Sequence, residues 1–289
     1  MRDKPLSTEP SFSSLSDHRI LALTGRDAAI FAHAQFMNDV TALPDQHWQW
    51  NGWLTPKGRV TALFALLRFD AETLWLLVPD SDPAALALQL QRFVFRSKVV
   101  IAARDDLRVS GAFVMPMNAS GSILDGSAQT HVDLDLTGDG GARTLRIGGN
   151  DVLDVPGTMA RWAAFDLMHG LPRLIETQST LWTPQQLSLD RLQAFSVKKG
   201  CYPGQEIVAR THFLGQAKRG LALFDTHAAV SIGAEVHDGE RSIGTVVSAA
   251  SQSGKHHALA VLPLGREASL LQVDGITLAE RSLLGGLAR

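Results

Sequence analysis

The chain has one cysteine, Cys201, and one tyrosine, Tyr202, and the two are adjacent. A single cysteine excludes a disulfide within the chain. It also excludes an iron–sulfur or zinc site built from four thiolates of the same chain. This cysteine usage fits a reducing compartment.

Net charge and long apolar runs are scarce as well. The formal net charge is −2 over 289 residues, so the whole chain gives no electrostatic reason to expect nucleic acid or a membrane as partner. The longest apolar run, 60–67, is far shorter than the ~20 residues that a membrane-spanning helix needs. Asp3 and Glu9 precede the first apolar stretch at Ile20, so neither a secretory nor a transit peptide is expected. These absences predict a cytoplasmic protein without a membrane partner and without direct nucleic-acid binding.

No metal site is expected either. His256 and His257 are adjacent in a strand-like run, where neighbouring side chains point to opposite faces. No Cys-x-x-Cys pair accompanies them, as a zinc site would require. The histidine pattern therefore predicts no metal centre.

The first part of the chain mixes strand-like and helix-like patterns. A stretch rich in serine and proline, 1–16, predicts a mobile leader. Strand-like runs separated by turn residues predict an antiparallel meander, and apolar residues at helical spacing predict two helices. The expected strands are 20–23, 48–54, 60–69, 73–78, 99–102 and 107–114, and the expected helices are 27–37 and 80–95.

The remainder predicts a looser lobe and then a barrel. Residues 118–149 are rich in glycine, aspartate and serine, and 156–174 has the pattern of a helix. After 215, five short strand-like runs predict a small β-barrel. No regular βαβ rhythm is present and no Gly-x-Gly-x-x-Gly follows a strand, so the predicted fold class is α+β. The expected units are two α+β lobes, approximately 17–114 and 115–215 and not necessarily continuous in sequence, followed by the β-barrel, 216–289.

Residues 198–210, which contain Cys201, form the most informative stretch of the sequence. Gly200, Pro203 and Gly204 predict a turn, and 205–210 predicts a helical or extended exit from it. A turn beside two lysines, close to a helix N-terminus, favours a thiolate over a thiol. The sequence therefore predicts a usable, solvent-reachable thiol with a lowered pKa, and a small buried hydrophobic residue is the alternative.

Three roles for Cys201 remain open at this point. It could be a nucleophile, a single ligand to a metal or cluster shared with another protein, or a thiol that contacts a bound cofactor. A nucleophile needs a base, and His212 is the nearest histidine in sequence, although it could equally be a surface residue. Between residues 196 and 220, five basic residues accompany one acidic residue. This excess suits a small anionic ligand, or else marks a solvated loop.

The octapeptide 199–206, Lys-Gly-Cys-Tyr-Pro-Gly-Gln-Glu, resembles the K-G-C-Y-x-G-Q-E motif of the YgfZ family. These are folate-binding proteins related to the aminomethyltransferase, or T-protein, of the glycine cleavage system. Residues 24–28 with Phe31, and 38–40, resemble the opening of the same superfamily. The resemblance covers about 17–289 and is weakest over 119–149.

The resemblance implies a T-protein-like, multi-lobed fold that binds tetrahydrofolate or a derivative. A family pattern of a Trp followed by Gly-x-Pro matches Trp162, Gly170 and Pro172, and implies that Trp162 lines the folate pocket, whereas the residue alone would pass as core filler. His18 falls near a second aromatic position of that pocket, with a surface histidine as the alternative. Cys201 and Lys199 are the expected functional pair. The other expected cofactor-binding residues are Gly200, Tyr202, Gly204, Gln205, Glu206 and Arg210.

The segment 58–62 departs from the aminomethyltransferases. An Asp pair that serves the transfer in those enzymes is replaced here by Thr61 and Ala62. The resemblance thus implies the YgfZ branch, whose members support iron–sulfur enzymes, including those that modify tRNA, so that iron–sulfur client proteins are the expected partners. Two alternatives remain: a tetrahydrofolate-dependent aminomethyltransferase or demethylating enzyme, and an interaction protein that has lost ligand binding.

Overall fold

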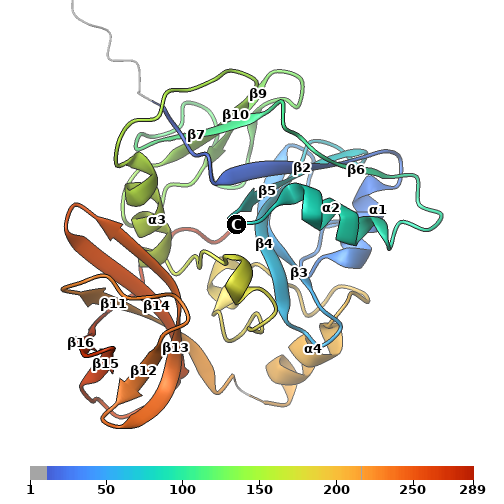
Figure 1. Ribbon diagram of the computed structural model, residues 1–289. Helices are drawn as coiled ribbons and strands as arrows, with labels where there is room; N and C mark the ends of the chain where they lie inside the picture. The colour runs from blue at the N-terminus through green and yellow to red at the C-terminus, as the bar shows by residue number, and fades with distance from the viewer. Residues whose placement is uncertain (1–11, 216) are drawn as a thin grey trace, which may run out of the picture.

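The computed structural model describes residues 12–215 and 217–289. Three β-sheets form three lobes around a common centre, which the last residues of the chain reach (Figure 1). Helices and antiparallel sheets are both present without a βαβ rhythm, so the predicted α+β class is confirmed. In the described part of the chain, no helix has the length and apolar character needed to cross a bilayer.

Lobe 1 is a five-stranded sheet with two helices on one face. Its strand order is β3-β4-β5-β2-β6, so the predicted meander is confirmed as β3-β4-β5. Leu21 and Leu23 of β2 point to α1 and α2, while Ile20 and Ala22 point to the centre of the molecule, as the alternation of a strand requires. The elements are β2 (His18–Thr24), α1 (Ala28–Gln35), β3 (His47–Leu54), β4 (Val60–Arg68), β5 (Thr73–Pro79), α2 (Pro83–Gln91) and β6 (Val100–Ala103).

Lobe 2 is also a five-stranded sheet, and it is more regular than its glycine-rich sequence suggests. Its order is β1-β7-β10-β9-β8. Strand β1 pairs with β7, and Leu15 behind it is 1% exposed. Residues 12–16 therefore belong to the fold and not to the expected mobile leader, whose first eleven residues lie outside those described. The strands are β1 (Ser13–Ser14), β7 (Arg108–Ala112), β8 (Asp125–Gly126), β9 (His131–Asp135) and β10 (Thr144–Gly148).

Helix α3 (Thr158–Met168) follows lobe 2 and is shorter than the predicted 156–174. It begins after Gly157 at φ +83° and has His169 as its C-cap, because Gly170 takes φ +69° and turns the chain away. An irregular segment with two short 3₁₀ helices, Glu176–Gln178 and Leu189–Leu192, leads to α4 (Gln205–Phe213).

The third lobe is a seven-stranded, barrel-like sheet in the order β16-β15-β12-β13-β14-β11-β17. All five predicted strand-like runs are strands here, and two short ones, β16 and β17, add to them. The strands are β11 (Arg219–Thr226), β12 (Glu235–Asp238), β13 (Arg241–Gln252), β14 (Lys255–Pro263), β15 (Leu271–Val273), β16 (Ile276–Thr277) and β17 (Ala279–Arg281).

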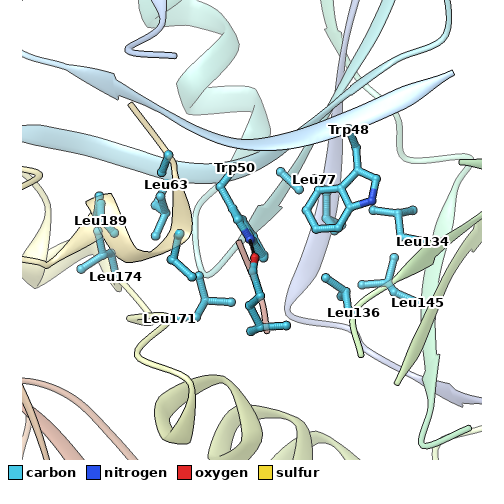
Figure 2. Close-up of a cluster of buried hydrophobic side chains, with 14 of the residues drawn as sticks. Trp48, Trp50, Leu63, Leu77, Leu134, Leu136, Leu145, Leu171, Leu174 and Leu189 are labelled. Carbon is cyan, nitrogen blue, oxygen red and sulfur yellow. Dashed lines mark hydrogen bonds between the residues drawn. The ribbon is translucent and has the colours of Figure 1, made fainter. Parts of the chain in front are cut away.

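One apolar cluster at the centre joins the lobes. Trp48 and Trp50 extend from the same face of β3 toward leucines of lobe 2 and of the irregular segment (Figure 2). Val247 and Leu259 of the barrel belong to the same cluster, and so does Leu287 near the end of the chain. The centre of this molecule is therefore filled by side chains.

A buried ionic network lies beside this cluster. Arg173, 7% exposed, donates hydrogen bonds to Asp80 (Nη2 to Oδ1, 2.7 Å), to Asp17 (Nη2 to Oδ2, 2.5 Å) and to Asp166 (Nη1 to Oδ2, 3.4 Å). Burial alone would raise the pKa of the Asp17 carboxyl, but its partners His18 and Arg173 outweigh burial and hold that pKa well below its usual range. The network joins the start of β2, the end of β5 and α3.

Replacing Arg173 by methionine is expected to lower the free energy of unfolding by about 3–5 kcal/mol, because the loss of one buried partner leaves the others uncompensated. Urea unfolding at neutral pH measures this. Arg241→Met is the control, since Arg241 is exposed and 4.0 Å from Asp238, and its loss should stay within about 1 kcal/mol. Equal losses in both variants would contradict the importance of Arg173.

Candidate functional site

The motif loop 199–206 is pressed against the turn between β3 and β4. Gly204 lies at φ +80° just before α4, and a Cβ there would come within 2.6 Å of the Thr55 carbonyl oxygen and 2.7 Å of the Gly58 Cα. Both its conformation and its surroundings therefore require glycine. This contact fixes where α4 begins and where Cys201, four residues earlier, is displayed. Cys201 is exposed, so the prediction of a solvent-reachable thiol is confirmed.

Lys199 is buried and anchors the loop to α1. Its Nζ donates hydrogen bonds to the carbonyl oxygens of His33, of Phe36 (2.6 Å) and of Asn38 (3.1 Å). A cation at the C-terminal end of a helix is stabilised by the helix dipole. Burial lowers the pKa of this ammonium to about 8, although Asp39 raises it. Lys199 therefore anchors the loop to α1. The motif had suggested a lysine at the surface beside the thiol, but Lys199 is buried.

Tyr202 and Gln205 are further anchors. The Tyr202 side chain is buried, its hydroxyl donates to the Ser196 carbonyl oxygen (3.2 Å), and burial raises the pKa of the phenol to about 12. The Gln205 Nε2 donates to the Lys199 carbonyl oxygen (3.2 Å). Two of the residues expected to bind a cofactor are therefore engaged in shaping the loop.

Other motif residues face solvent. Gly200, Glu206 and Arg210 are exposed, as is Cys201. His212 is exposed on the last turn of α4, so it is a surface residue, as one of the two alternatives had it.

The predicted cationic patch is smaller than the sequence suggests. Lys199 is buried, and Arg219 donates from Nη1 to the Ile243 carbonyl oxygen (2.9 Å). Lys198, Arg210 and Lys218 are the exposed cations of the stretch.

Trp162 is a residue of α3, and its side chain packs into the core against lobe 2. Its ring is 1% exposed, and the Arg143 guanidinium carbon lies 4.2 Å from its centroid. At Gly111 a Cβ would come within 2.4 Å of the ring. The structure thus encloses the ring, and its role as a folate-stacking surface stays a prediction.

His18 lies beside Trp162, as the family resemblance implies, with the two ring centroids 6.4 Å apart and edge to face. The surface alternative is wrong, because His18 is 8% exposed and its Nδ1 is 2.8 Å from the Asp17 Oδ1. Trp162 and His18 belong to the α3 side of the molecule, whereas the motif loop adjoins α4 on another side (Figure 1). The expected binding residues therefore form two separate groups.

A pocket of about 310 Å³ lies beside Thr61 and Ala62, the positions at which the resemblance implies the loss of the Asp pair. Asp80 and the exposed Glu176 also line it. Asp80 is held by Arg173, so its carboxylate is not free of partners. Carboxylates thus reach this pocket from the turn after β5 and from the irregular segment, which the sequence could not reveal.

Arg143 is a buried charged residue that the sequence analysis did not single out. It is 0% exposed, lies between the Trp162 and Phe165 rings and donates from Nη1 to the Asp166 Oδ1 (2.6 Å). Its Nη2 has no hydrogen-bond partner among residues 12–215 and 217–289. Its position in a glycine-rich stretch gave no signal of burial.

The two adjacent lysines of the motif offer a direct test. Lys199→Met is expected to lower the free energy of unfolding by about 2–4 kcal/mol, because buried carbonyl oxygens lose their donor. Lys198→Met, at an exposed position, should change it by about 0.5 kcal/mol or less. Chemical denaturation measures both, and equal effects would refute the anchoring role of Lys199.

Several known proteins are similar in sequence to this chain over most of its length. No family model matches the chain. A tRNA-modifying protein YgfZ of Klebsiella pneumoniae is 29% identical over 264 residues, covering 82% of this chain and 80% of that protein. A YgfZ of Aliivibrio fischeri is 26% identical over 277 residues (88% and 86%), and an uncharacterized protein of Haemophilus influenzae is 28% identical over 261 residues (84% and 85%).

Among solved structures, the glycine cleavage system aminomethyltransferase T of Bartonella henselae matches with a TM-score of 0.69 at 15% identity, covering 94% of this chain and 85% of that one. At this identity the match establishes the fold. The resemblance to the YgfZ family found in the motif is confirmed by the curated relatives, and the chain is a relative of the YgfZ tRNA-modifying proteins with the fold of a glycine-cleavage T-protein.

Proposed function

We propose that this chain is a folate-binding accessory protein that supports the assembly, maintenance or repair of iron–sulfur enzymes, including tRNA-modifying ones, through the thiol of Cys201. The observation that carries the proposal is the display of Cys201 on an anchored loop. Buried Lys199 and Tyr202 flank the exposed thiol and tie the loop to the fold. A thiol held in this way is available to another molecule at little conformational cost.

The surroundings of Cys201 favour a thiol that acts on a partner molecule over a thiol that works alone as a catalytic nucleophile. His212 is an exposed residue of the last turn of α4, and one thiol cannot hold a cluster by itself. The thiolate is therefore offered to a cluster carried by a client protein, or it contacts the bound folate. Lys198 and Arg210 are exposed on the same stretch and suit an acidic surface or an anionic tail. We place this activity in the cytoplasm.

The proposed cofactor is tetrahydrofolate or a derivative. A folate combines a flat heteroaromatic ring with a carboxylate tail, so it needs an aromatic surface, polar groups for the ring edge and cations for the tail. The chain carries tryptophans at its centre and exposed cations beside the motif. When bound, tetrahydrofolate supplies one-carbon chemistry that no side chain provides.

A second candidate is a tetrahydrofolate-dependent aminomethyltransferase or demethylating enzyme. The pocket beside Thr61 and Ala62 favours it, since Asp80 and Glu176 bring carboxylates to the place where the transferase pair is missing. A demethylation assay with tetrahydrofolate separates this enzyme from the accessory protein. An interaction protein without ligand binding would give neither turnover nor folate binding.

Purified protein is expected to bind tetrahydrofolate with micromolar affinity. The affinity should fall as salt rises from about 0.05 to 0.5 M, because pairing between an exposed tail and surface cations is screened. Calorimetry and tryptophan fluorescence measure binding. Absence of both a heat and a fluorescence change would rule out the proposed cofactor.

Cys201→Ala is expected to abolish support of iron–sulfur enzymes in cells while leaving the fold and folate binding nearly unchanged. Removing one exposed sulfur deletes little buried apolar area, so the stability cost should be about 1 kcal/mol or less. Complementation of cells that lack the native protein, with an iron–sulfur tRNA-modifying activity as readout, tests this. Lys198→Ala is a nearby control that retains the thiol. Full complementation by Cys201→Ala would disprove a role for the thiol.

A further inference from the structure

The loop between α2 and β6, residues 92–98, projects outward at the edge of lobe 1 (Figure 1). Hydrogen bonds fix both of its ends. Just after α2, the Phe93 N–H donates to the Leu90 carbonyl oxygen (3.0 Å). Just before β6, the Lys98 N–H donates to the Oδ2 of Asp27 (2.6 Å), the residue that precedes α1. The loop is therefore anchored to both helices of lobe 1.

Phe95 stands at the tip of this loop. The Ser97 N–H donates to the Val94 carbonyl oxygen (2.8 Å), so Phe95 and Arg96 are the two central residues of a tight turn. Phe95 lies at φ +42°, a conformation that favours glycine or asparagine, and it is 88% exposed. Positive φ and an exposed ring both cost free energy, and a ring in water gains little packing in return. The fold alone gives no reason for a phenylalanine at this position.

Basic residues surround Phe95. Between positions 83 and 104 the sequence has four basic residues and no acidic one. Arg104 is paired with Asp106 (2.7 Å). The other three are exposed and form no ion pair in the described part of the chain. These three cations are Arg92, Arg96 and Lys98.

Arg26 adds a fourth exposed cation from the turn before α1. Its side chain is 70% exposed, and its Nε lies 3.8 Å from the Asp27 Oδ1. Asp27 is the acidic residue that touches the loop, and its other carboxylate oxygen accepts the hydrogen bond from the Lys98 backbone. The surface around Phe95 thus has four exposed cations beside one carboxylate that already has partners.

A free aromatic ring among cations matches the chemistry of single-stranded nucleic acid. Proteins that bind such strands stack bases on aromatic side chains and place cations along the phosphates. The expectation of no direct nucleic-acid binding followed from the net charge of −2, which averages over the whole chain and does not describe this loop. We propose that the loop 92–98 and Arg26 bind a single-stranded stretch of nucleic acid, with Phe95 stacked on a base and the cations on phosphates. This inference depends on neither folate nor the thiol.

A lipid surface would attract the same cations, but it needs more apolar area than the loop offers. The Phe93 ring packs edge to face on the Trp53 ring, with centroids 5.9 Å apart, and Phe93 is only 40% exposed. Phe95 is left as the free ring of the tip. Even a whole acyl chain gives only marginal membrane binding by itself, whereas stacking on a base needs one ring. The loop therefore favours nucleic acid over a bilayer.

Fluorescence anisotropy tests the proposal with a labelled single-stranded RNA of about 15 nucleotides and with DNA of the same sequence, at about 50 mM salt. Phe95→Ala should weaken binding by about tenfold, because one base loses its stacking partner. Arg96→Ala should weaken binding and make its salt dependence shallower, by about 0.7 in the log–log slope for one lost phosphate contact. Two exposed residues elsewhere provide matched controls, Phe213→Ala on α4 and Arg241→Ala on the barrel, and neither should change the affinity.

The two oligonucleotides distinguish RNA from DNA as the ligand. Failure of the unchanged chain to bind either one would overturn the proposal, and so would equal losses in the controls. Co-sedimentation with vesicles of phosphatidylglycerol and phosphatidylcholine covers the lipid alternative. Binding to vesicles without binding to either oligonucleotide would overturn the proposal in favour of a membrane surface.

Phe95→Gly separates a role in binding from a role in folding. Glycine adopts φ +42° without strain, so this variant should melt about 2 °C higher than the unchanged chain while binding as weakly as Phe95→Ala. A lower melting temperature would show that the ring supports the fold. Undiminished nucleic-acid binding by both variants would show that the ring is not used. Either result would overturn the proposal.

Discussion

Arg173 is the interaction on which the arrangement of the lobes depends. Its side chain reaches Asp17 before β2, Asp80 after β5 and Asp166 on α3. Its backbone N–H donates to the Ser248 Oγ of the barrel, and its carbonyl oxygen accepts from the same hydroxyl (both 2.9 Å). One residue thus joins lobe 1, α3 and the barrel just after the chain leaves α3.

A network of this kind determines geometry more than stability. Burying charges costs several kcal/mol per ion, and the attraction between partners offsets that cost only when every partner is in place. The apolar cluster around Trp48 and Trp50 supplies the driving force for packing the lobes together. Apolar contacts are not directional, however, so they do not by themselves fix how the lobes are oriented. The hydrogen bonds from Arg173 to its carboxylate partners are directional, so they favour one orientation of the elements they join. Asp80 lies at φ +61°, a conformation that is uncommon for residues other than glycine.

The sequence predicted the elements whose signal is local. The strands of lobe 1 and the barrel were found because their alternation and turn residues lie within a few residues of one another. Lobe 2 was underestimated because its edge strand, Ser13–Ser14, pairs with residues about a hundred positions later. The ionic network joins residues 93 and 156 positions apart, which no periodicity reveals. For the site, the motif correctly indicated an exposed cysteine, but it could not separate the anchoring Lys199 and Tyr202 from the exposed residues between them.

Strand β3 runs from the centre of the molecule to the motif loop, and its length sets the distance between them. Trp48 lies near its inner end, and Thr55, which follows its last residue, touches Gly204 of the cysteine loop. At about 3.3 Å per residue these two positions are roughly 20 Å apart. The central tryptophans and the thiol are therefore two separate places in the molecule, one enclosed by the fold and one open to solvent.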